Sequence, residues 1–160
     1  GKNVRYLSAG GRRDFGSISL FAELSYIDTA SIIVSNVKSG YASGIYHFGS
    51  HSAFLSYAST TADGVDLGDM GVNFEALSLI PGGAELYQGV QSLLNVYSSD
   101  QQTYSVGWRW DFHDKMAFKL QFDTTKIAEE GSTIWLRRLE DATPMKETIN
   151  TVFTSLSFAF

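Results

Sequence analysis

The chain has 160 residues, a formal net charge of −5 and no cysteine. Without cysteine the chain has no disulfides, thiol catalysis or cysteine-based zinc sites, and the negative charge argues against nucleic acid as a partner. The mean hydropathy is −0.06, and no run of about 18 apolar residues predicts a transmembrane helix. Fifteen Gly, two Pro and 14% aromatic residues favour one all-β domain over residues 1–160.

Alternation of apolar and polar residues recurs along the chain and predicts strands, because successive side chains of a strand point to opposite faces. The clearest case is residues 102–112, where aromatic residues alternate with small or charged ones, followed by a similar run at 116–126. In chain order the pattern predicts strands at 3–12, 17–27, 40–49, 52–61, 102–112, 116–126 and 148–160.

The connections between these strands alternate between short and long. Short polar turns lie at 13–16, 49–51 and 113–115, whereas the long loops near 28–39, 61–101 and 127–147 are polar and carry much of the acidic charge. Outer-membrane barrels have short periplasmic turns and long extracellular loops. The pattern therefore predicts an antiparallel transmembrane β-barrel whose C-terminus lies on the short-turn side.

The number of predicted strands, seven, bears on whether the chain forms a whole barrel. Single-chain bacterial barrels normally have an even number of strands, and the run Ser31–Val34 reads as an extension of a loop-side strand rather than a new one. We therefore expect the chain to be the C-terminal seven or so strands of a larger barrel.

Part of the longest loop is too apolar for a bare surface loop. After the turn Pro81–Gly83, a helical face is predicted, packed against the barrel. Two placements fit this helix equally well: a constriction loop inside the lumen, or a cover for a neighbouring subunit. The residues of the face are Leu86, Val90, Leu93, Leu94 and Tyr97.

Polar and charged residues occupy one face of the predicted strands. A water-filled lumen tolerates such groups, whereas an Arg or Lys at the lipid midplane costs roughly 2–4 kcal/mol. They are expected to line a pore and to tune its selectivity, or else to form solvated ion pairs along the barrel wall. The pore-lining candidates are Glu23, His47, Arg109, Asp111, Lys119, Gln121 and Asp123.

Aromatic residues occupy the opposite face. Such rings are typical of the girdle at the membrane interface, and a ligand-stacking track inside a sugar pore is the alternative. The predicted girdle residues are Tyr104, Trp108, Trp110, Phe112 and Phe118.

Metal binding and catalysis have weak support. Asp63, Asp66 and Asp69 recur among glycines, as in calcium loops, but without the EF-hand spacing, so a solvated loop is the preferred interpretation. No G-x-S-x-G elbow and no nucleophile beside a positioned base is recognisable, so no enzyme activity and no cofactor are expected.

The chain ends on an alternating strand that finishes in an aromatic residue. Val152, Leu156, Phe158 and Phe160 share one face of this strand. This ending resembles the C-terminal signature of Gram-negative outer-membrane proteins, which the barrel-assembly machinery reads. Residues 44–57 are similar to a hairpin of general porins, and residues 104–123 to the penultimate hairpin of porin-like proteins.

The resemblance implies a porin-type barrel in the bacterial outer membrane that lets small hydrophilic solutes diffuse passively. Members are commonly sixteen-stranded and often trimeric, so a homotrimer, the lipid bilayer, lipopolysaccharide and the assembly machinery are the implied partners. The chain is too short for a complete pore of that kind. A structural or interaction barrel without a pore, or a substrate of the assembly machinery, is the alternative, and a soluble lipocalin-type barrel is a third.

Overall fold

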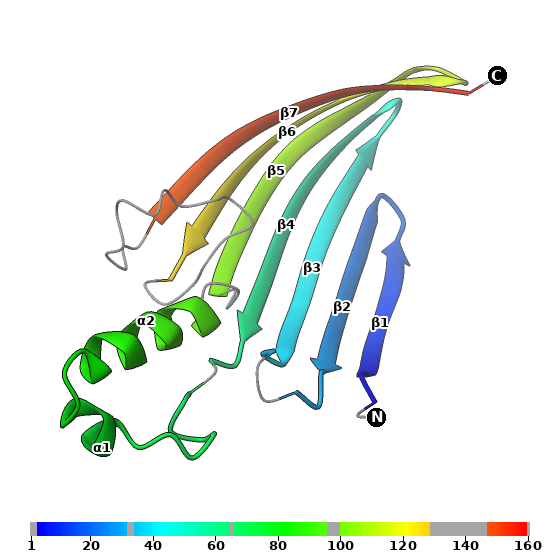
Figure 1. Cartoon of the computed structure of the whole chain (residues 1–160). Coiled ribbons are helices and arrows are strands. Elements are labelled where there is room, and N and C mark those ends of the chain that lie inside the picture. Colours follow the sequence, from blue (N-terminus) through cyan, green and yellow to red (C-terminus); the bar gives the residue numbers. More distant parts are fainter. Residues whose placement is uncertain (1–2, 32–33, 65, 96–99, 129–146, 160) are drawn as a thin grey trace.

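The computed structural model describes residues 3–31, 34–64, 66–95, 100–128 and 147–159. These residues form one antiparallel sheet and two helices (Figure 1). In chain order the elements are β1 (Arg5–Phe15), β2 (Ile18–Asp28), β3 (Val37–Phe48), β4 (His51–Ala62), α1 (Phe74–Ser78), α2 (Gly83–Asn95), β5 (Asp100–His113), β6 (Met116–Ile127) and β7 (Glu147–Phe158).

The seven strands are hydrogen-bonded in sequence order, each antiparallel to the next, with β1 and β7 at the two edges. The prediction of seven antiparallel strands is therefore confirmed. Two predicted boundaries are wrong, since β1 continues to Phe15 and β3 already begins at Val37. Of the run Ser31–Val34, predicted to extend a strand, Ser31 and Val34 are not in a strand, and the two residues between them lie outside the described residues.

A two-residue turn closes each of the three hairpins, and in the β5–β6 hairpin the register shifts between Trp110 and His113. Phe15 pairs with Ile18, Phe48 with His51, and His113 with Met116. Gly16 and Gly49, the first residues of two of these turns, have φ of 59° and 62°. A two-residue hairpin loop that begins with Gly at positive φ is the II′ geometry, which matches the twist of the flanking strands.

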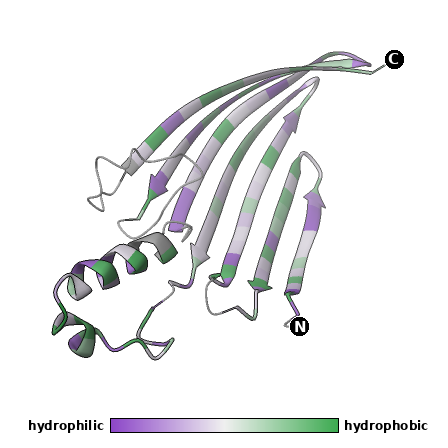
Figure 2. Cartoon of the chain, viewed as in Figure 1, coloured by the Kyte–Doolittle hydropathy of each residue, from purple (hydrophilic) through white to green (hydrophobic). Residues whose placement is uncertain are grey.

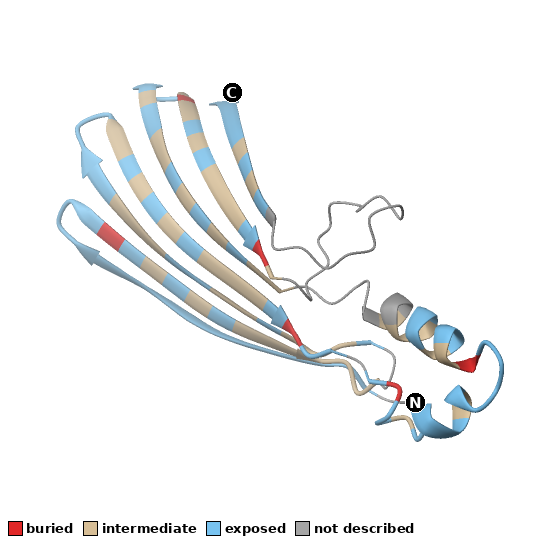
Figure 3. Cartoon of the chain, turned by 90° about the vertical axis from the view of Figure 1, so that its left-hand side faces the viewer, coloured by how far each residue is buried: buried red, intermediate tan, exposed pale blue. Residues whose placement is uncertain are grey.

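The sheet bends along its strands into an open trough (Figures 1 and 3). Hydrophobic and hydrophilic residues are interspersed along the strands (Figure 2). Residues on the polar face of β2 to β6 are mostly half-buried, whereas those on the apolar face are mostly exposed. Because bending crowds side chains on the inner side of a sheet, the polar face is the concave one and the apolar face is the convex one.

The described residues have almost no conventional hydrophobic core. The buried apolar residues are Ala62, Leu67, Ala117 and Ile127, and no large side chain is fully buried. Leu24, Leu55 and Val152 on the convex face are 71%, 65% and 63% exposed. A water-soluble sheet buries its apolar face against another layer, and the described residues provide no such layer.

The predicted helix exists as α2, and a short helix α1 precedes it that the sequence did not predict. Asn73 caps α1 by accepting a hydrogen bond at Oδ1 from the Ala76 N–H at 3.2 Å. The two helices pack against each other, with the Phe74 and Tyr87 rings 5.0 Å apart. Neither described helix is long and apolar enough to cross a membrane.

The predicted packing of this helix against the barrel is wrong for the described part of the chain. Among the described elements, α2 contacts α1 and neither helix contacts a strand, and both lie beyond the strand ends opposite the short turns (Figure 1). Leu86, on the apolar face of this helix, is 62% exposed. The apolar face therefore does not identify a strand as the surface that the helix contacts. The side chains of Leu93 and Tyr97 lie outside the described residues.

Candidate functional site

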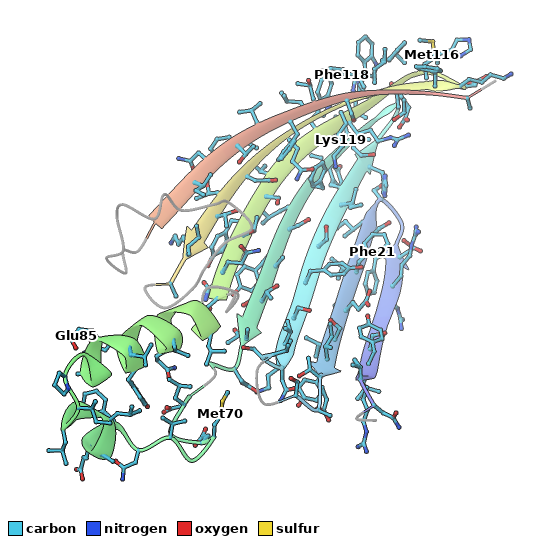
Figure 4. All side chains as sticks on the ribbon, viewed as in Figure 1. Phe21, Met70, Glu85, Met116, Phe118 and Lys119 are labelled. Carbon is cyan, nitrogen blue, oxygen red and sulfur yellow. The ribbon has the colours of Figure 1, made fainter. Side chains whose placement is uncertain are left out.

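The concave face collects all seven residues predicted to line a lumen. Register places Arg109 opposite Lys119 and Ser105 opposite Asp123, and the same parity extends through His47 and Glu23. Phe118 and Lys119, consecutive on β6, leave opposite faces of the sheet (Figure 4). The predicted division of these residues between two faces is thus present in the structure.

Arg109 and Asp111 form an ion pair near the short-turn end of the concave face. Arg109 Nε and Nη2 donate to Asp111 Oδ1 at 2.9 and 2.6 Å. Both side chains are about half exposed, so the pair contributes about 0.2–1 kcal/mol to stability. Lys119, directly opposite Arg109, has no carboxylate partner among the described residues and instead lies over the Phe54 ring, 4.7 Å from its centroid.

Gly107 makes room for the Phe54 ring. A Cβ at this position would collide with the ring and would lie 2.7 Å from the Leu120 carbonyl oxygen. The ring therefore lies against Gly107 of β5, and the Lys119 ammonium lies over the ring. Phe54 is a site residue that sequence analysis missed, because an aromatic residue on the polar face contradicts simple alternation.

A hydrogen-bonded chain of side chains crosses β2, β3 and β4 on the same face. Ser19 Oγ lies 3.1 Å from His47 Nε2, and His47 Nδ1 lies 3.0 Å from Ser52 Oγ. Ser19 is 3% exposed. Sequence analysis found no base beside a hydroxyl, so it missed this arrangement. Neither ring nitrogen of His47 has a carboxylate partner to orient the imidazole as a catalytic base. These hydrogen bonds link the three strands.

Hydroxyl and amide groups cover much of the remaining concave face. Gln121 Nε2 donates to both carboxylate oxygens of Asp123 at 2.8 and 3.0 Å. Cross-strand hydroxyl pairs stabilise a sheet and leave a hydrophilic wall. They join Ser25 to Ser39 and Ser43 to Ser56 at 2.7 Å, and Thr103 to Thr125 at 3.0 Å.

Aromatic rings gather at two levels of the convex face. Near the short turns, the predicted girdle residues Trp108, Trp110, Phe112 and Phe118 form a continuous series with ring centroids 5.2–6.3 Å apart. His51 joins this series, 5.5 Å from Trp108, although the sequence placed it in a turn. Its Nδ1 is buried without a hydrogen-bond partner among the described residues.

The fifth predicted girdle residue, Tyr104, lies at the other level, with its ring 5.1 Å from that of Tyr57. Eight positions separate Tyr104 from Phe112, which is about 27 Å along a strand. Beyond Tyr104 the convex face becomes polar at Gln102, Lys38 and Lys126. The two aromatic levels therefore bound an apolar band about 27 Å long along the strands.

The final strand follows its predicted parity. Val152, Leu156 and Phe158 pair with Phe122, Phe118 and Met116 on the convex face. Phe160, the fourth residue predicted to face lipid and to serve as an assembly signal, lies outside the described residues.

Asp63 and Asp66 of the long loop bind separate partners. Asp63 pairs with Lys38 at 3.1 Å, while Asp66 accepts hydrogen bonds from the Gly68 N–H at 2.8 Å and from Tyr87 Oη at 3.4 Å. Burial raises the pKa of the Tyr87 hydroxyl, and the Asp66 carboxylate raises it further. Among the described residues, no three acidic or histidine side chains group closely enough to hold a metal ion.

Comparisons with protein-family models, with curated proteins and with solved structures found no match for this chain.

Proposed function

We propose that this chain forms part of the wall of a porin-type outer-membrane β-barrel, through which small hydrophilic solutes diffuse passively. One observation carries the proposal: the curved sheet turns its polar face inward and its apolar face outward. A bilayer stabilises this arrangement, because lipid covers the convex side while water fills the concave side. In water the same arrangement exposes a large apolar surface that monomeric soluble proteins rarely tolerate.

Two further features support an outer-membrane setting. The short turns lie together at one end of the sheet and the long connections at the other (Figure 1), as in barrels with periplasmic turns and extracellular loops. The C-terminal strand resembles the signal that the barrel-assembly machinery reads. The proposed partners are this machinery, the lipid bilayer, lipopolysaccharide in the outer leaflet and further copies in a homotrimer.

A structural or interaction barrel without a pore is the second candidate, and the concave aromatic residues favour it. Phe21 and Phe54 carry Arg12 and Lys119 over their rings at 4.9 and 4.7 Å, and Phe153 lies on the same face. Small barrels fill their interior with side chains of this size.

Cysteine scanning tests the proposed wall, since the native chain has no cysteine to interfere. Single cysteines replace consecutive β6 residues from Phe118 to Asp123 in the full chain, expressed in the outer membrane of a Gram-negative cell. We expect a membrane-impermeant maleimide to label positions 119, 121 and 123 and to spare 118, 120 and 122.

The labelling outcomes separate the candidates. Equal labelling of both parities would contradict a lipid-facing convex side. Protection of both parities would indicate a filled interior and favour the barrel without a pore.

A further inference from the structure

The convex face contains a hollow of about 750 Å³ across β1 to β5. Small residues form its floor, because register aligns Gly11 with Ala22 and Ala22 with Ala42, and places Gly44 beside them. Larger side chains, including those of Leu55 and Tyr57, form its wall. The hollow therefore interrupts an otherwise raised apolar band.

Arg13 borders this hollow, and no carboxylate of the described residues forms an ion pair with it. The ion pairs of the described residues join Arg12 to Asp14, Lys38 to Asp63, and Arg109 to Asp111. The Arg13 guanidinium lies over the Phe15 ring, 5.3 Å from its centroid, and so extends toward the Gly16–Ser17 turn. Between the two aromatic levels, the described convex residues include no carboxylate.

We propose that the hollow binds a glycerophospholipid of the periplasmic leaflet, with an acyl chain on the small-residue floor and the phosphate on Arg13. This inference rests on the proposed function, which places the convex face in a bilayer. The fork of a guanidinium matches phosphate oxygens, and a long side chain can keep its charge at headgroup depth. Arg13 extends toward a short turn, the periplasmic side in such barrels, so the outer-leaflet lipopolysaccharide lies at the wrong depth.

Charge also argues against a second copy of the chain in the hollow. A copy docked through the same face would bring Arg13 against apolar side chains or against its own equivalent. No described carboxylate within the band could pair with it, and burying an unpaired charge is strongly unfavourable. A phosphate supplies the missing countercharge.

Native mass spectrometry can count lipids that the full chain retains after mild detergent extraction from vesicles of phosphatidylethanolamine and phosphatidylglycerol. We expect one retained phospholipid on the wild type and about tenfold weaker retention for Arg13→Gln, the effect of losing a charged hydrogen bond. Arg109→Gln is the matched control, an arginine on the concave face outside the hollow, and should retain the lipid.

A second pair of variants tests the hollow itself. Gly44→Leu should fill it and displace the acyl chain, since a Cβ at Gly44 meets only Leu20 Cδ2 at 3.5 Å and the backbone can accept it. Ala53→Leu adds similar bulk at an exposed convex position of β4, outside the hollow, and should leave retention unchanged.

Flotation with the vesicles separates two failures. A chain that does not float would overturn the proposed function together with this inference. A chain that floats but retains phospholipid equally with and without Arg13 would overturn the inference alone. Cross-linking of two copies through Ala42→Cys with no retained lipid would also overturn it, as would retention of lipopolysaccharide in its place by protein purified from cells.

Discussion

Replacing Val106 with Arg is the sharpest test of where the convex face lies. Val106 is near the middle of the apolar band, paired with Leu55 and Phe122, and is 53% exposed. If that exposed surface faces lipid, an Arg at the midplane costs roughly 2–4 kcal/mol. If it faces water, a half-exposed substitution changes the free energy of unfolding by about 0.5 kcal/mol or less.

The preceding residue supplies the matched control. Ser105 lies on the concave face of the same strand, opposite Ser56 and Asp123. Ser105→Arg should change stability by about 0.5 kcal/mol or less if this face is hydrated. Gln102→Arg, at the polar border of the convex face, should cost about 0–1 kcal/mol, because the penalty falls toward the interface.

Urea unfolding of the chain refolded in phospholipid vesicles measures these differences. With a slope of about 2 kcal/mol per M, a cost of 2–4 kcal/mol lowers the unfolding midpoint by about 1–2 M. A Val106→Arg midpoint within about 0.3 M of the Ser105→Arg midpoint, on the same slope, would refute the assignment of the convex face to lipid.

Three other variants or measurements follow from the concave face and the sheet edges. Arg109→Glu combined with Lys119→Glu should cost about 1 kcal/mol or less, because both charges are solvated, and should shift reversal potentials of the assembled pore toward cations; unchanged potentials would argue against a lumen. Gly107→Ala should cost about 1–3 kcal/mol, since a Cβ there collides with Phe54, whereas Gly11→Ala, which meets nothing within 4 Å, should be tolerated. Finally, planar-bilayer recordings of the 160-residue chain alone should show no stable conducting pore, and reproducible large unitary steps would contradict this expectation.

Within a short hairpin, sequence alone assigned residues to a face but not to exact pairs. Period-two alternation placed Arg109 and Lys119 on the polar face of neighbouring strands. Counting from the two-residue turn after β5 would place Arg109 opposite Leu120, and a register shift between Trp110 and His113 brings it opposite Lys119 instead. A bulge of this kind changes the pairing and has no signal in the alternation pattern.

Residue pairs between strands joined by a long loop could not be predicted from the sequence. Ser19 meets His47 across the β2–β3 connection, and His51 meets Trp110 across the connection that contains both helices. A long loop leaves the register of the next strand open, so neither contact could be counted from the sequence. The predicted packing partner of the helix was wrong for a similar reason. The apolar stripe predicts a helix but does not identify the surface that the helix contacts.

The β7 edge of the sheet leads to the same conclusion as its two faces. In hydrocarbon each unpaired backbone group costs several kcal/mol, so a membrane sheet needs partners along β1 and β7. Soluble proteins protect an exposed edge with charges, prolines or bulges. Between Thr148 and Phe158, β7 has none of these: it carries no charge and no proline, and it pairs with β6 without a register shift. An edge this long and unprotected is suited to pairing with another strand, as closure of a barrel wall requires, and the outward apolar band is suited to the lipid that would surround such a wall.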